Sequence, residues 1–227
     1  MGRLFDLDSP LMRFLNLVGD LLILNFLVLI CCIPIITIGA SCTGMYYVLL
    51  KIVRGEEGYL VKGFFKSFKQ NFKQATILWL IMILVILVYV GDFCIFRYSG
   101  LTFPKVLVVM ILSIALILIM VAVYVFPVLS RFDNTVKNTL KNAFCMAVLN
   151  LPKTLLLILL QAVPIVVLYF SSYATIFVIM FGVSLPAYCS AHLLSGIFKK
   201  FEPQTEAVVS DYEFSIQAED GNEEDNG

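Results

Sequence analysis

The chain has 227 residues, of which 60% are apolar and only 14% are charged. A water-soluble domain of this length needs more polar surface to cover its core, so the composition excludes a soluble globular protein and indicates a membrane protein. The formal net charge is zero, but half of the 16 acidic residues follow Pro203, and no Lys or Arg follows Lys200. The expected fold class is therefore all-α, a polytopic transmembrane helix bundle of about five spans with an acidic tail.

The start of the chain, residues 1–20, is expected to be an interfacial amino-terminal segment, because apolar residues recur there at helical spacing among charged ones. A cleaved secretion signal is the alternative for this region. It is disfavoured because the apolar run that follows is too long and the residues before it are not distinctly basic.

Residues 21–50 carry no charge. Thirty helical residues would extend about 45 Å, which is too long for one crossing and too short for two. Pro34, Gly39 and Gly44 predict a helix break, since Pro removes a helix hydrogen bond and Gly permits a bend. We expect one span before Pro34 and a second helix over residues 40–53 near the cytoplasmic face.

Residues 51–73 form the first connector, which holds six of the 16 basic residues. At 100° per residue its lysines fall in one narrow arc, which predicts an amphipathic helix on the membrane surface. These lysines are Lys62, Lys66, Lys69 and Lys73. Basic residues beside a hydrophobic span stay on the cytoplasmic side, so we expect this connector to be cytoplasmic.

Apolar runs predict four more spans, over residues 74–91, 106–127, 154–169 and 174–197. A second basic connector with an amphipathic helix precedes the fourth span. Its basic residues include Arg131, Lys137 and Lys141.

With the amino terminus outside, five spans put twelve basic residues inside and four outside, which favours a cytoplasmic carboxyl terminus in the cell membrane. A sixth crossing over residues 144–152 is the alternative. The transmembrane domain is thus residues 21–201, and the acidic residues 202–227 are expected to be disordered.

The first connector carries the candidate docking surface for a cytoplasmic partner. Two adjacent carboxylates between glycines predict a tight turn beside the lysine-rich helix. The residues assigned to this surface are Arg54, Glu56, Glu57, Lys66, Lys69 and Lys73. Two simpler interpretations stay open: the carboxylates cap that helix at its amino end, and the lysines lie on the anionic lipid of the bilayer.

Small residues four apart predict close packing between helices. One such set on the fifth span is Ala187, Ala191 and Ser195, and Ala40 with Gly44 forms another. Packing within one bundle is favoured over packing against a partner protein or a second copy of the chain. Asn25 and Gln161 are the main polar residues within the spans, and we expect them to make interhelical hydrogen bonds.

Motifs of hydrolytic, metal and phosphate-loop chemistry are absent, including HExxH, GxSxG and a Gly-rich loop with GK[ST]. The six cysteines have no CxxC spacing, and the single histidine, His192, is expected to pack or hydrogen-bond. Intramembrane charges that drive coupled transport are also missing from the predicted spans. We therefore expect no enzymatic activity, no cofactor, no metal and no nucleic-acid partner.

The stretch CCIPIITIGASCTGMYYVLLKIVRGEEGYLVKGFFKSFKQNFKQAT, with FPVLSRFDNTVKNTLKNAF and LPKTLLL further on, resembles the YesL family of small bacterial membrane proteins. The resemblance covers residues 5–201 and leaves out the acidic tail. It implies a domain of unknown function without established catalytic residues. The resemblance also implies an accessory role, because genes of this family are found beside genes for carbohydrate-uptake ABC transporters and for glycan degradation.

Two functions follow as hypotheses. The first is an accessory or regulatory partner of carbohydrate uptake, whose cytoplasmic face contacts an ABC transporter subunit or a regulator. The second is a permease or channel for a sugar or small solute, lined by the break at Pro34 as broken helices line transporters.

Overall fold

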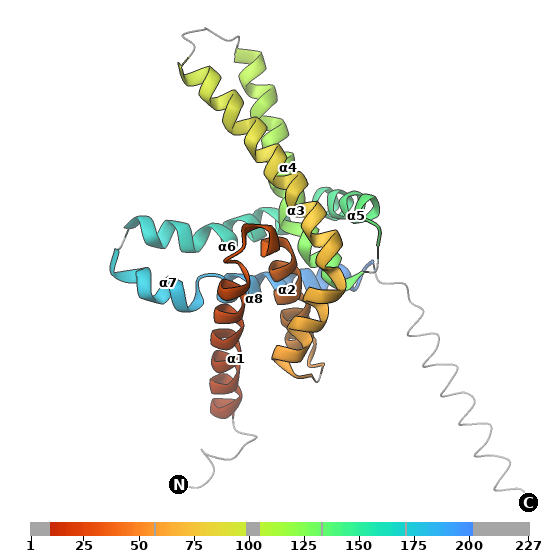
Figure 1. The fold of residues 1–227 in the computed structure, drawn as a ribbon, viewed down its shortest axis with the longest axis vertical. Coiled ribbons are helices and arrows are strands. Elements are labelled where there is room, and N and C mark those ends of the chain that lie inside the picture. The colour runs from red at the N-terminus through yellow and green to blue at the C-terminus, as the bar shows by residue number, and fades with distance from the viewer. Residues whose placement is uncertain (1–9, 57, 99–104, 133, 171, 202–227) are drawn as a thin grey trace, which may run out of the picture. The chain divides into compact units, whose positions relative to one another are not determined.

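A computed structural model describes residues 10–56, 58–98, 105–132, 134–170 and 172–201. These residues are helical and contain no strand (Figure 1). The elements are α1 (Pro10–Cys31), η1 (Ile35–Thr37), α2 (Ile38–Arg54), α3 (Leu60–Tyr98), α4 (Lys105–Arg131), α5 (Val136–Leu149), α6 (Leu151–Phe170), η2 (Ser172–Ala174), α7 (Thr175–Phe181) and α8 (Ser184–Phe198). The expected all-α class is confirmed. The acidic tail and the first nine residues lie outside the described residues.

The uncharged run of residues 21–50 folds as an antiparallel helical hairpin of α1 and α2 (Figure 1). The turn lies at Pro34, where the sequence predicts the break, and the Ser41 hydroxyl donates to the Val28 carbonyl across it at 3.3 Å. The predicted helix break and second helix are confirmed, and α2 is itself long and apolar enough to cross a membrane. Because the chain doubles back, the amino end of α1 and the carboxyl end of α2 lie at the same end of the hairpin.

Gly39 and Gly44 do not break a helix, which corrects the role predicted for them. Both are buried inside α2, where they let α3 come close in an antiparallel arrangement. A Cβ on Gly39 would lie 2.6 Å from the Ala75 carbonyl oxygen, and one on Gly44 would lie 3.1 Å from that of Phe64. The absence of a side chain thus sets the distance between these two helices.

The turn of the hairpin has its backbone groups satisfied by neighbouring side chains. The Trp79 indole of α3 donates to the Ile35 carbonyl at 2.7 Å, and the Thr37 hydroxyl lies within hydrogen-bond distance of the Cys31 and Pro34 carbonyls. Carbonyls freed where a helix ends need such partners in a medium without water. Trp79 of α3 therefore stabilises this turn.

The last predicted span, residues 174–197, is not one straight helix, which corrects the sequence expectation. It is broken between α7 and α8, whose axes differ by 47°. Asn25 of α1 is fully buried at this second break. Its amide donates to the Ile179 carbonyl at 2.7 Å and accepts from the Val183 and Ser184 N–H groups at 3.2 and 3.1 Å. One side chain thus supplies partners for three backbone groups freed by the break.

Five described helices are long and apolar enough to cross a membrane, namely α1, α2, α3, α4 and α6. The bent pair of α7 and α8 would make a sixth if it counts as one span. The candidate span that the sequence did not predict is α2. Residues 144–152, which the sequence offered as a sixth crossing, lie across the end of α5 and the start of α6. The described residues up to Ser195 form one compact unit, and those from Gly196 on belong to a second.

Candidate docking surface and buried polar contacts

The turn after α2 forms because Gly55 adopts a left-handed conformation with φ of 70°. The N–H of Gly55 bonds to the Ile52 carbonyl at 3.1 Å, and the N–H of Glu56 bonds to the Lys51 carbonyl at 3.0 Å. A glycine in this conformation commonly ends a helix by satisfying its last carbonyls. The tight turn predicted from the sequence is confirmed.

The carboxylate of Glu56 joins the two basic connectors. One of its oxygens lies 3.9 Å from the Lys51 ammonium, and the other lies 3.6 Å from the guanidinium of Arg131, at the end of α4. The carboxylate therefore links the turn after α2 to the end of α4. Glu57, its predicted partner in docking, lies outside the described residues.

The lysine row on α3 is exposed along its length, as the sequence predicts. The phenylalanines of the same helix do not share one environment. Phe64 is fully buried beside Gly44, whereas Phe65 and Phe72 are 38% and 39% exposed. The outer face of this part of α3 thus combines ammonium groups with apolar rings, the composition of a helix at a membrane interface.

The second connector contains α5, which begins at the N-cap Thr135, whose hydroxyl accepts from the Asn138 N–H. Its buried residues are Thr139, Ala143, Met146 and Ala147. Lys137 and Lys141 are exposed, so they add positive charge to the surface of this connector. Arg54, at the last turn of α2, is half-buried.

The polar residues predicted to bond between helices do so. Gln161 of α6 donates to the Tyr46 hydroxyl of α2 at 2.7 Å and to the Ser190 hydroxyl of α8 at 3.4 Å. The predicted packing residues Ala187, Ala191 and Ser195 are buried on α8. His192 is exposed, with its ring edge-to-face with Tyr188 at 4.8 Å. Among the described residues no three His, Cys, Asp or Glu side chains could hold a metal ion.

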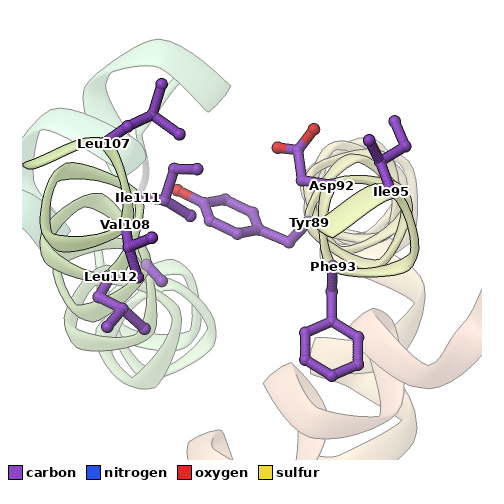
Figure 2. Close-up of a pocket in the computed structure, with 9 residues that line it drawn as sticks. Tyr89, Asp92, Phe93, Ile95, Leu107, Val108, Ile111 and Leu112 are labelled. Carbon is purple, nitrogen blue, oxygen red and sulfur yellow. The ribbon is translucent and has the colours of Figure 1, made fainter. Parts of the chain in front are cut away.

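An apolar groove of about 470 Å³ lies between α3 and α4 (Figure 2). Tyr89 of α3 reaches across it toward Leu107 and Ile111 of α4, and Asp92 also lines it (Figure 2). Besides this carboxylate and the phenol, the lining is aliphatic and aromatic. Because most of its lining residues are apolar, the groove offers a surface for apolar groups.

Sequence reasoning missed two features of this site. It did not foresee that Arg131 pairs with Glu56, because residues 75 positions apart give no periodic pattern. It also missed Asn25 as the residue that completes a broken helix, although an isolated amide in an apolar run and Gly182 further on were visible in the sequence.

The chain is similar to a family model and to a curated protein. Residues 21–93 match the family model described as "Protein of unknown function, DUF624". The chain is 32% identical over 137 residues to the "Uncharacterized protein YesL" of Bacillus subtilis (strain 168), covering 60% of this chain and 59% of the relative. The chain thus matches about three fifths of the length of this curated relative. No solved structure matches it. The chain is thus similar to YesL over these 137 residues, and its residues 21–93 match the DUF624 model.

Proposed function

We propose that the protein is a non-enzymatic accessory protein of carbohydrate uptake in the cell membrane, and that its basic face binds a transporter subunit or a regulator. The observation that carries the proposal is the pairing of Glu56 with both Lys51 and Arg131, which joins the two connectors into one face. The link to carbohydrate uptake rests on the gene neighbours that the resemblance to the YesL family implies.

The antiparallel hairpin supports a cytoplasmic position for this face. It puts the start of α1, with Arg13, on the side of the first connector, and the nine residues that precede α1 in the sequence carry Arg3. The count of basic residues then changes from 12 inside and 4 outside to 14 inside (12 + 2) and 2 outside (4 − 2), leaving only Arg97 and Lys105 outside. Since basic residues flanking spans are retained in the cytoplasm, the larger asymmetry favours this orientation.

The charge of the face determines the kind of partner that it fits. Lys69 and Lys73 of α3 and Lys137 and Lys141 of α5 are exposed. Opposite charges on two surfaces accelerate association and select the partner more than they add affinity. The partner surface should therefore be acidic, and its binding should weaken as the salt concentration rises.

Charge reversal tests this proposal. Lys69→Glu combined with Lys73→Glu should reduce the recovery of transporter components at least about fivefold in affinity purification, because like charges would then face each other. The cells should be grown on a glycan that induces the neighbouring transporter genes. The matched control, Lys69→Arg with Lys73→Arg, should keep the recovery of the original chain. If the original chain itself recovers no transporter component, the docking proposal is wrong.

A permeation path is the second candidate, because helix breaks at two places resemble the discontinuous helices of transporters. In transporters the backbone groups at such breaks bind the substrate. Here Asn25, Thr37 and Trp79 already bond to the backbone groups at the two breaks. This arrangement favours a structural role for the breaks. Sugar flux through liposomes that contain only the purified protein would reverse that preference.

A further inference from the structure

A cavity of about 390 Å³ lies at the charged end of the α1–α2 hairpin, where α1, α2 and the start of α3 meet. Its polar lining comes from three helices and the turn after α2. These residues include Tyr47, Lys51, Glu56, Tyr59, Lys62 and Lys66. Asp20 of α1 forms part of the wall. The volume is in the range of small-molecule sites, which begin at about 300 Å³.

Two of the lysines are held in place by aromatic rings. The Lys51 ammonium lies 5.3 Å from the centre of the Tyr47 ring, and the Lys62 ammonium lies 4.7 Å from that of Tyr59. A cation–π contact positions an ammonium without neutralising its charge. Because an ammonium has three N–H donors, both groups retain donors for a ligand.

The carboxylates of the lining differ in their surroundings. Glu56 already pairs with Lys51 and with Arg131, so much of its negative charge is balanced by protein groups. Three ammonium groups against two carboxylates leave the lining with a formal charge of +1 (3 − 2), before Arg131 is counted. The cavity therefore favours an anion, and its remaining carboxylate, Asp20, can accept hydrogen bonds from hydroxyl groups.

We propose that this cavity binds a hydroxyl-bearing phosphate ester, with its phosphate among Lys51, Lys62 and Lys66 and its hydroxyls toward Asp20. A phosphate offers several charged acceptor oxygens to ammonium groups that approach from two helices. The ester is either a soluble sugar or polyol phosphate or the headgroup of an anionic phospholipid such as phosphatidylglycerol. The proposal does not rest on the docking function, although Glu56 and Lys66 belong to both sites. The docking test changes Lys69 and Lys73, which lie outside the cavity, so the two proposals can fail separately.

Binding to the purified full-length protein in a neutral detergent tests the proposal. The probes are glycerol 3-phosphate for the soluble source and short-chain phosphatidylglycerol for the lipid source, with short-chain phosphatidylcholine as the zwitterionic comparison. Calorimetric titration should detect saturable binding of at least one of the two anionic probes. Binding of glycerol 3-phosphate would identify a soluble ligand, and binding of phosphatidylglycerol alone would identify a lipid. If neither anionic probe binds, or if phosphatidylcholine binds as well as phosphatidylglycerol, the proposal is overturned.

Variants on one helix separate the cavity from general surface charge. Lys66→Gln should weaken binding about tenfold, because it removes one charge-assisted contact with the phosphate. Lys69→Gln, one turn further along α3 and outside the cavity, should change the Kd less than about twofold at moderate salt. Lys66→Arg should restore most of the affinity. Equal weakening by Lys66→Gln and Lys69→Gln would show that the anion is attracted by the lysine row as a whole, which would also overturn the proposal. The thermal midpoints of the variants, measured without ligand, exclude unfolding as the cause.

Discussion

Replacing Gly39 with alanine is expected to destabilise the protein by about 3 kcal/mol, the upper part of the range for overpacked cores. The added Cβ would lie 2.6 Å from the Ala75 carbonyl oxygen, 2.8 Å from the Trp79 Cβ and 3.0 Å from a ring carbon of Phe126. The nearest of these is a backbone atom, which cannot rotate away. Helix α2 would have to move away from α3, and the Trp79 hydrogen bond to Ile35 at the hairpin turn would be strained as well.

Two other glycines provide the controls for this measurement. Gly44→Ala should have a smaller effect, since its Cβ would lie 3.1 Å from the nearest atom. Gly19→Ala should be neutral or stabilising by up to about 1 kcal/mol, because it adds a methyl group to the interior of α1 with no atom within 4 Å. The thermal midpoint of each of the three variants is measured in detergent, with size-exclusion chromatography as the readout of unfolding. Equal midpoints for Gly39→Ala and Gly19→Ala would contradict the close contact of α2 with α3.

Replacing Asn25 with leucine is expected to cost about 2–3 kcal/mol of stability, because three backbone groups at the α7–α8 break lose their partner in a buried site. The N–H groups of Val183 and Ser184 and the carbonyl of Ile179 would then have no water within reach. Hydrogen exchange of residues 179–184 should rise in this variant. Exchange in α3, which makes no bond to Asn25, should stay close to that of the original chain.

Asn25→Asp distinguishes the hydrogen bonds from simple packing at this break. An aspartic acid side chain has the same shape and is kept neutral by burial, so one of its oxygens can accept from the N–H groups and its single hydroxyl can donate to the Ile179 carbonyl. Its stability should fall between those of the original chain and Asn25→Leu if the bonds to the backbone matter most. A leucine variant as stable as the original would mean that Asn25 does not support the break.

The sequence allowed the hairpin turn to be located but not the direction of the chain after it. Pro34 marks the turn because it removes a helix hydrogen bond, and this effect depends only on the residue itself. Whether the next helix continues or returns depends on contacts such as that of Ser41 with Val28. Such contacts join residues from both sides of the turn, so the pattern of one helix does not reveal them.

The glycines were misread for a related reason. A glycine in an apolar run is compatible with a bend and with close packing, and only the neighbouring helix distinguishes the two. For Gly39 that neighbour is α3, some 36 residues further along the chain at Ala75. The second break, between α7 and α8, was missed because an almost uniformly apolar run has no periodic change at the site of a bend.

In the candidate site, too, features of a single helix could be predicted and contacts between helices could not. The exposed lysine row of α3 follows from helical periodicity and was predicted residue by residue. The cavity was not predicted, because Asp20, Lys51 and Lys66 meet only when the hairpin closes and α3 packs against α2. Periodicity thus identifies the chemistry that a helix presents, whereas the sites depend on which helices come together.

The orientation of the basic face is the claim on which the account depends most, and insertion of a reporter after Gly58 tests it directly. An epitope there should be labelled only after the inner membrane has been permeabilised, and the same epitope at the amino terminus should behave in the same way, because the hairpin returns the chain to its starting side. An epitope after Gly100, in the connection between α3 and α4, should be labelled in spheroplasts without permeabilisation. Labelling of the Gly58 site in intact spheroplasts would put the lysines outside the cell and contradict the account.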